Sequence, residues 1–121
     1  MVAFGADWQY FFTNFGEVRF YIDRAGLVHL PNGNTRAWEK QEWKEPDAGM
    51  GGETGLLLLV EVDCKQHKYI GRDLRPMKGT PKSLKVVGAL RSGYVGHWEY
   101  FGPNDLDEAR FSAWCDTAPR K

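Results

Sequence analysis

Two cysteines, Cys64 and Cys115, constrain the fold of this chain more than any other feature of its sequence, and the chain has no others. Cys64 closes the apolar run that starts at Leu56, and Cys115 closes the last segment with helical spacing. A redox pair or a metal site would use such cysteines, but their spacing matches neither a Cys-x-x-Cys motif nor a zinc ligand set. The sequence therefore predicts a structural disulfide, which would tie a helix to a sheet and indicate an oxidising compartment.

The length and composition indicate one globular domain. The chain has 121 residues, and we expect a single domain over residues 1–121 with its core at about 7–115. Hydrophobic residues make up 42% of the chain, which is too many for a disordered protein. The longest apolar run, residues 56–60, is far shorter than the roughly 18 residues that cross a bilayer, so no transmembrane helix is expected.

Strand signals dominate the sequence. Segments with alternating or continuous apolar residues are separated by turn cues such as Pro31-Asn32-Gly33-Asn34. The expected strands are residues 7–13, 17–23, 27–30, 35–44, 56–63, 68–74, 84–90 and 97–101. The strand at 56–63 is expected to be central, because burial on both faces permits a continuous apolar run. Residues 45–55 are expected to form a flexible loop, and the prolines of 75–82 are expected to interrupt the sheet.

The period of the apolar residues changes after Gly102-Pro103. Asp105, with Glu108 three residues later, fits a capping box, and apolar residues then follow at helical spacing as far as Cys115. The predicted fold class is therefore α+β and mostly β. It consists of an antiparallel sheet of about six strands, with one C-terminal helix packed on a face and tied by the disulfide.

The charges balance overall but are unevenly distributed. There are 16 basic and 16 acidic residues, so the net charge indicates no polyanion partner. Residues 65–91, however, hold eight basic residues and one acid, Asp73, whereas residues 39–53 hold five acids against Lys40 and Lys44. This bias predicts either a positive binding face or a solvated strand pair balanced by the acids. The candidate binding residues are Lys65, Lys68, Arg72, Arg75, Lys78, Lys82 and Lys85.

The tryptophans are candidates for core packing or for partner contacts. Four of them, Trp8, Trp38, Trp98 and Trp114, are interpreted as core residues. Trp43 stands among charged residues, so it is the tryptophan expected to be exposed and to anchor a partner. The large side chains of 7–13 and 35–44 also predict a homodimer formed by edge pairing or face stacking.

A set of short motifs follows the order found in one known family. The motifs are Glu61-Val62-Asp63-Cys64-Lys65, Tyr69, Trp98-x-Tyr100-x-x-Pro103 and a capped helix that ends in Cys115. With the early segment Phe20-Tyr21-Ile22-Asp23, they resemble the surface-adhesin protein E domain over about residues 7–115. The chain departs from the family pattern at two places. Arg24-Ala25 replaces the usual Ser-Ile, and the 45–55 loop is rich in glycine. Neither departure affects the implied fold, but both argue against a ligand shared with the family.

The resemblance implies a fold, a location and a role. It implies an antiparallel sheet with a C-terminal helix held to one face by the cysteine pair. The family comprises exported bacterial proteins, often lipoproteins, and named members adhere to host matrix proteins. It therefore implies a periplasmic, outer-membrane or cell-surface location. The chain opens without a charged segment followed by an apolar one, so we expect the signal peptide to have been removed.

No arrangement of residues in the sequence points to catalysis. His29, His67 and His97 lie on different expected strands or strand ends, and nothing in the spacing brings them to a common metal site. Phosphate-loop, serine-elbow and RNA-binding motifs are not found. We therefore expect no enzyme, no cofactor and no nucleic-acid partner. The predicted function is an exported binding domain for a protein or an anionic polysaccharide. The alternative is a periplasmic small-molecule-binding or accessory module, with a pocket between helix and sheet.

Overall fold

A computed structural model describes residues 7–14, 17–47, 53–79, 85–86 and 95–115 of the chain. The elements in this part are β1 (Trp8–Thr13), β2 (Arg19–Asp23), β3 (Val28–His29), β4 (Thr35–Asp47), β5 (Glu53–Asp63), β6 (Lys68–Lys78), β7 (Lys85–Val86), β8 (Trp98–Tyr100) and α1 (Asp105–Cys115). Each predicted strand therefore has a counterpart. Of the strand expected over 84–90, however, only Lys85–Val86 falls among the described residues.

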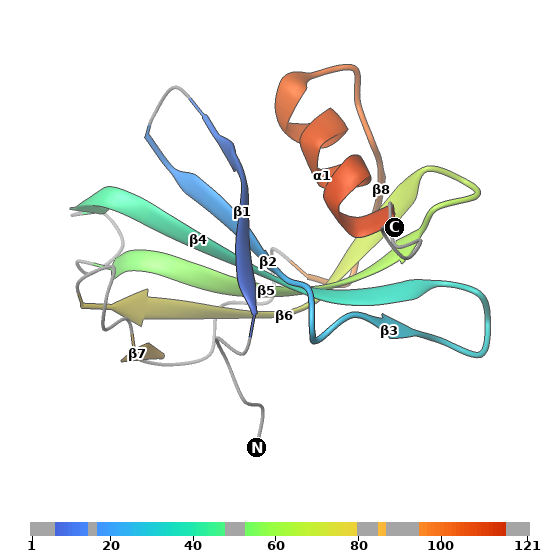
Figure 1. Cartoon of the computed structure of the whole chain (residues 1–121), viewed down its shortest axis with the longest axis horizontal. Helices are drawn as coiled ribbons and strands as arrows, with labels where there is room; N and C mark the ends of the chain where they lie inside the picture. Colours follow the sequence, from blue (N-terminus) through green and yellow to red (C-terminus); the bar gives the residue numbers. More distant parts are fainter. Residues whose placement is uncertain (1–6, 15–16, 48–52, 80–84, 87–94, 116–121) are drawn as a thin grey trace.

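The described strands form one antiparallel sheet (Figure 1). The main order is β1-β2-β4-β5-β6-β7, with β3 beside β4 and β8 beside β6. One helix, α1, follows the sheet, so the predicted mostly-β fold with a C-terminal helix is confirmed. Among the described residues, no helix has the length and apolar character needed to cross a membrane.

Strand β5 lies in the middle of the sheet, as its apolar run predicted. It pairs with β4 on one side and with β6 on the other. Leu57 and Leu58 point to opposite faces, because successive strand residues alternate, and both are buried. Side chains of β5 are therefore buried on both faces of the sheet, and α1 packs on the face that contains Leu58.

Helix α1 lies over one face of the sheet and contacts β1 and β4 (Figure 1). Its Trp114 is fully buried and packs in a cluster that includes Ile22 and Val60. The rings of Tyr69 and Phe101 surround the Trp114 indole, with centroids 5.4 and 5.9 Å away. Burying one large aromatic side chain among these groups supplies much of the apolar attraction that holds the helix to the sheet.

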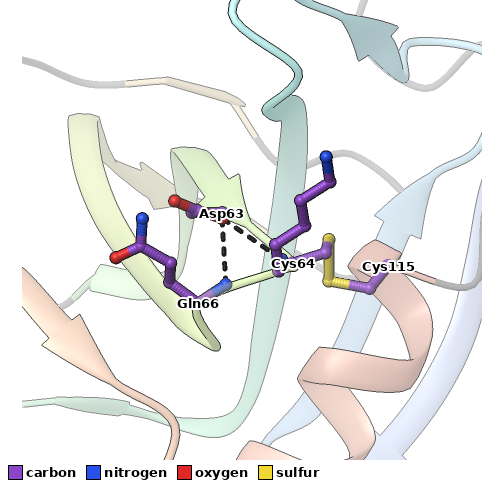
Figure 2. The surroundings of a disulfide bond; sticks show 5 residues. Asp63, Cys64, Gln66 and Cys115 are labelled. Atoms are coloured by element: carbon purple, nitrogen blue, oxygen red, sulfur yellow. Dashed lines mark hydrogen bonds between the residues drawn. A yellow bond between two sulfur atoms is a disulfide. The ribbon is translucent and has the colours of Figure 1, made fainter.

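The predicted disulfide between Cys64 and Cys115 is confirmed (Figure 2). The two Cα atoms lie 5.7 Å apart, a usual separation for a disulfide. The bond joins the turn that follows β5 to the last residue of α1. In that turn, Asp63 accepts hydrogen bonds from the backbone N–H groups of Lys65 and Gln66 at 3.1 and 3.0 Å. A disulfide fits a protein that folds outside the reducing cytosol.

A buried ion pair forms a second tie between the helix and the sheet. Arg110 on α1 donates from Nε and Nη2 to the two carboxylate oxygens of Glu39 on β4, at 2.9 and 2.8 Å. Glu39 is fully buried and also accepts a hydrogen bond from Gln41 at 2.8 Å. Burial acts to lower the pKa of Arg110, but the Glu39 carboxylate outweighs it, so the pKa is raised. The guanidinium also lies over the rings of Phe20 and Trp114.

The cap of α1 differs from the prediction by one residue. Asn104 is the N-cap, because its Oδ1 accepts the N–H of Asp107 at 2.9 Å and its carbonyl accepts the N–H of Glu108. Asp107 in turn accepts the N–H of Gly102 at 2.6 Å. The capping box expected at Asp105 was therefore wrong, since Asn104 offers an equally good side-chain acceptor one position earlier.

Three strand ends extend beyond the predicted limits. Strand β4 runs to Asp47 and β5 begins at Glu53, so strands occupy both ends of the expected 45–55 loop, and residues 48–52 lie outside the described residues. Strand β6 continues through Pro76 to Lys78. Pro76 lies opposite Leu56 of β5 and just before the β6 residues that pair with β7. The interruption expected over 75–82 was wrong for 75–78, because a proline is tolerated where a strand has a partner on one side only, and β5 is the described partner at Pro76. Residues 80–82 lie outside the described residues.

Candidate functional site

The predicted basic residues whose side chains are described extend along β6 and the turn before it. Those described with their side chains are Lys65, Lys68, Arg72, Arg75 and Lys78. At about 3.3 Å per strand residue, Lys68 and Lys78 lie about 33 Å apart. Lys82 lies outside the described residues, and only the backbone of Lys85 is described, in β7.

Two of these cations already have carboxylate partners. Arg75 Nε lies 2.9 Å from Asp73 Oδ2, and Arg72 Nη2 lies 3.0 Å from Glu61 Oε1. Lys68 belongs to none of the ion pairs found among the described residues. Its Nζ instead lies over the Trp98 ring, 5.0 Å from the centroid. The positive charge available to a ligand is therefore concentrated at Lys68 on this part of the strand.

Two aromatic side chains of β8 stand exposed beside Lys68. Trp98 is 41% exposed and Tyr100 is 69% exposed. They share one face, because residues two apart in a strand point the same way. The register places Tyr100 opposite Lys68, and Arg72 Cζ lies 5.9 Å from the Trp98 ring centroid. We call this group the β8 surface; its members are Glu61, Lys68, Arg72, Trp98 and Tyr100.

Glu61 fixes the polar part of the β8 surface. Its Oε1 accepts from Arg72, and its Oε2 accepts from Asn34 at 2.6 Å and from Asn32 at 3.2 Å. The hydrogen bond from Asn34 is the largest cause of a lowered pKa at Glu61, and burial opposes it only in part. Glu61 is therefore a carboxylate at neutral pH, and it orients Arg72 before any ligand arrives.

The β8 surface is one end of a longer row of residues across the sheet. The register aligns Val28, Arg36, Glu61, Ile70 and Trp98 on β3, β4, β5, β6 and β8. Neighbouring strands lie about 4.8 Å apart, so the row spans about 19 Å. Arg36 and Val28 are exposed at its far end, and Ile70 is buried within it. The row therefore holds two charged side chains, Arg36 and Glu61, and ends in the aromatic ring of Trp98.

A cavity of about 350 Å³ lies on the opposite face, beside α1. This volume is near the lower limit of small-molecule sites, which is about 300 Å³. The lining residues are Gln41, Leu56, Leu58, Tyr69, Gly71, Leu74, His97, Glu99 and Arg110. Tyr69 donates its hydroxyl to Glu99 at 3.2 Å, and burial raises the pKa of Tyr69 to about 12. The cavity thus combines an apolar wall of leucines with a hydrogen-bonding rim.

Strand β8 separates the β8 surface from this cavity. Trp98 and Tyr100 point to the first, and Glu99 lines the second, as alternation along a strand requires. The strand is fixed at both ends by backbone hydrogen bonds of 2.9 Å, from Gly96 N–H to the Gly71 carbonyl and from Phe101 N–H to the His67 carbonyl. Two different candidate sites therefore share one short edge strand.

The exposed tryptophan is Trp98, and Trp43 is partly buried. Trp43 lines a cavity of about 530 Å³ with neighbours that include Arg19 and Lys44. The prediction that Trp43 is exposed and Trp98 belongs to the core was therefore wrong. The overlooked signal was the alternation in Trp98-Glu99-Tyr100, which puts two rings on one face of a strand. A role for Trp43 as a partner anchor stays a prediction.

The histidines lie in separate places. His29 is exposed on β3, and His97 lines the cavity beside α1. His67 stacks on Phe111 of α1, with ring centroids 4.5 Å apart. In the described ranges, no group of three or more histidine, cysteine or acidic side chains is placed to hold a metal ion.

The two segments expected to form a homodimer differ in position. Strand β1 lies at one end of the described sheet, and its Tyr10 is 58% exposed. Strand β4 lies inside the sheet, paired with β2 and β3 on one side and with β5 on the other. Residues 35–44 therefore do not form an edge of the described sheet, and face stacking through this segment stays a prediction. The homodimer itself stays a prediction.

Comparison with known proteins adds no relative to this description. No protein-family model, no curated protein and no solved structure matches the chain. The resemblance to the surface-adhesin protein E domain therefore stays a prediction that rests on its motifs. The chain is defined by its own geometry, as a disulfide-tied α+β domain with an aromatic and cationic surface on one face and a cavity on the other.

Proposed function

We propose that this chain is a non-enzymatic binding domain of an exported bacterial protein, located in the cell envelope or at the cell surface. It contacts another macromolecule through the β8 surface. The observation that carries the proposal is the exposure of Trp98 and Tyr100 side by side, next to Lys68 and Arg72. Large aromatic residues and arginine are enriched at the centres of binding interfaces, where they contribute most of the affinity.

The order already present in the β8 surface supports this role. Glu61 holds Arg72 in place, and pairing between β6 and β8 fixes the backbone of Trp98 and Tyr100. A surface that is ordered before binding loses little side-chain entropy on contact, so more of the interaction energy becomes affinity. Rigid strands also place binding groups more accurately than loops do.

Two features support export. The disulfide fits an oxidising compartment, and the resemblance adds the bacterial envelope and a lipid anchor. Fractionation of cells that express the complete gene tests this directly. A signal peptide ending in a lipobox, encoded upstream of the chain, would support a lipoprotein. Recovery of the protein in the cytosol with both thiols reduced would contradict export.

The binding role is tested with immobilised probes of known chemistry. The panel contains purified extracellular-matrix proteins, poly-glutamate and heparin. We expect at least one probe to retain the protein, and we expect the double variant Trp98→Ala/Tyr100→Ala to weaken that retention about tenfold or more. Tyr10→Ala is the matched control, because Tyr10 is also an exposed aromatic residue but lies on β1. Retention that is equally strong in the double variant would contradict the proposal.

The cavity beside α1 favours a second candidate function, the binding of a small amphiphilic molecule. Leucine side chains would receive the apolar part, and Glu99 and His97 would bind its polar end. A nuclear magnetic resonance screen of small amphiphiles tests this. Shifts confined to Tyr69, His97 and Glu99 would support the cavity. Shifts centred on Trp98 would assign the ligand to the β8 surface.

A further inference from the structure

We infer that the ligand of the β8 surface is an acidic polysaccharide, with a sugar ring stacked on Trp98 and an acidic group bound by Lys68. This inference rests on the proposed function and specifies the class of partner. Sugar rings carry one face of C–H groups, which are attracted to the electron-rich face of an aromatic ring. Trp98 offers such a ring at the end of the sheet, with 41% of its surface exposed.

The groups around Trp98 favour a hydroxyl-rich ligand over a protein. Protein interfaces are centred on apolar clusters, from which water is excluded by a surrounding rim. Buried Ile70 lies opposite Trp98 and Tyr100 shares its face, but the ring itself is flanked by the cations of Lys68 and Arg72. Beyond Arg72 lies the Glu61 carboxylate with the amides of Asn32 and Asn34. Such groups are suited to the many donors and acceptors of a sugar chain.

The charges assign the acidic group to Lys68. Arg72 is already held by Glu61 through both Nε and Nη2, at 3.3 and 3.0 Å. Lys68 takes part in none of the ion pairs that the described chain contains, and its Nζ lies 5.0 Å from the Trp98 centroid. A carboxylate or sulfate on a sugar stacked at Trp98 would therefore lie within reach of Lys68.

The shape of the surface favours an extended chain. The row from Trp98 through Glu61 to Arg36 crosses the sheet at right angles to the strands and spans about 14 Å. A linear polymer can follow such a band over several units, whereas a single sugar would use only its aromatic end. Arg36, exposed at the far end, provides a second cation for an acidic chain.

Binding to three polysaccharides tests the inference. Heparin carries sulfates and carboxylates, hyaluronan carries carboxylates only, and dextran is neutral. We expect heparin and hyaluronan to bind more tightly than dextran, and we expect the affinity to fall as salt is added. Trp98→Ala should weaken binding about tenfold, and Trp98→Tyr should retain most of it because a ring remains. Lys68→Ala should weaken binding to heparin about threefold and reduce its dependence on salt.

Matched controls separate this site from general charge. Lys78→Ala removes the same charge from the same strand about 33 Å away, and it should leave heparin binding unchanged. The inference is overturned if dextran binds as tightly as heparin, or if Lys78→Ala and Lys68→Ala have equal effects. If a protein probe loses binding in Trp98→Ala while no polysaccharide binds, the polysaccharide is excluded and the proposed function stands. If Trp98→Ala/Tyr100→Ala alters no binding at all, both fail.

Discussion

At the scale of single residues, Arg110 shows how a charged side chain can occupy a core position. Its guanidinium packs over Phe20 and Trp114, and both of its bonded nitrogens donate to Glu39. The Glu39 carboxylate accepts a further hydrogen bond from the side-chain amide of Gln41. Nothing local in the sequence links residue 39 to residue 110, because the pair exists only once α1 has packed on β4.

Removing one member of this pair should be costly. Arg110→Met leaves a buried carboxylate without its partner, so we expect the free energy of unfolding to fall by about 3–5 kcal/mol. Urea denaturation measures it. The double variant Glu39→Leu/Arg110→Met should recover most of the loss, because apolar side chains of similar size then fill the site. Arg75→Met is the control on an exposed pair and should cost less than about 1 kcal/mol. Equal losses in all three variants would contradict a special role for the buried pair.

Tyr69 should ionise late in a pH titration. Burial raises its pKa from 10.0 to about 12. Because the folded-state pKa lies above the unfolded one, the contribution to stability is complete below pH 10.0 and is lost as the pH rises through about 12. Ultraviolet absorbance of tyrosinate measures the titration. Tyr69→Phe should remove the latest step, and Tyr100→Phe should leave that step in place. A late step that persists in Tyr69→Phe would show that another group causes it.

At the scale of the elements, α1 is held along its length by contacts of different kinds. Asn104 caps its start, Phe111 stacks on His67, and Cys115 is bonded to Cys64 at its end. His67 has a φ of 57°, in the left-handed region that favours glycine. The His67 ring stacks on Phe111, and a glycine at this position could not make that contact. The β5–β6 turn therefore contacts the helix through His67.

Breaking the disulfide should loosen α1 more than the sheet. In the chain-entropy model the loop it closes is worth about 4 kcal/mol, so Cys64→Ala/Cys115→Ala should lower the melting temperature by many degrees. The near-ultraviolet circular dichroism of the aromatic residues, to which buried Trp114 contributes, should weaken before the strand signal in the far ultraviolet does. Calorimetry and circular dichroism of the oxidised and reduced protein measure both effects. An unchanged melting temperature after complete reduction would contradict this.

The sequence predicted which elements exist better than it predicted where they end. Strand alternation, the Asn32-Gly33 turn and helical spacing are local signals, and the elements they indicate are present. The continuation of β6 through Pro76 depends on which neighbouring strand faces that residue, which no local signal contains. The candidate site was predicted in part for a similar reason. Lys68 and Arg72 were identified by charge, whereas the exposure of Trp98 depends on β8 lying at an edge.

At the scale of the whole molecule, the last described element, α1, contacts the first, β1. Strands β4, β5 and β6 are joined in sequence order as antiparallel neighbours, and α1 then returns to contact β1 and β4 (Figure 1). Contacts between the last element and the first therefore join the two ends of the described chain. Strand β1 lies at an end of the described sheet, and no described strand pairs with its outer edge.

We expect the protein to form a homodimer through β1. Tyr10 is 58% exposed on this edge, and pairing two copies would bury it. Light scattering at tens of micromolar should give twice the 13.8 kDa mass of one chain. Tyr10→Lys should restore the monomer, because a charge on an edge strand opposes pairing. Trp98→Ala should leave the dimer intact, because β8 pairs with β6 and lies far from β1 in the strand order. A mass of one chain at every concentration would contradict this assembly.

The pairing register of β8 determines which of its side chains face solvent and which face the cavity. Its backbone is fixed at Gly96 and at Phe101, and only its alternation decides which side chains meet solvent. A slip of one residue in the pairing of β8 with β6 would turn every side chain of β8 to the other face. Glu99 would then face the solvent, and the two rings would fill the cavity beside α1. Substitutions within β8 would therefore change which ligand the β8 surface binds. A slip of one residue in its pairing would instead remove the β8 surface and close the cavity.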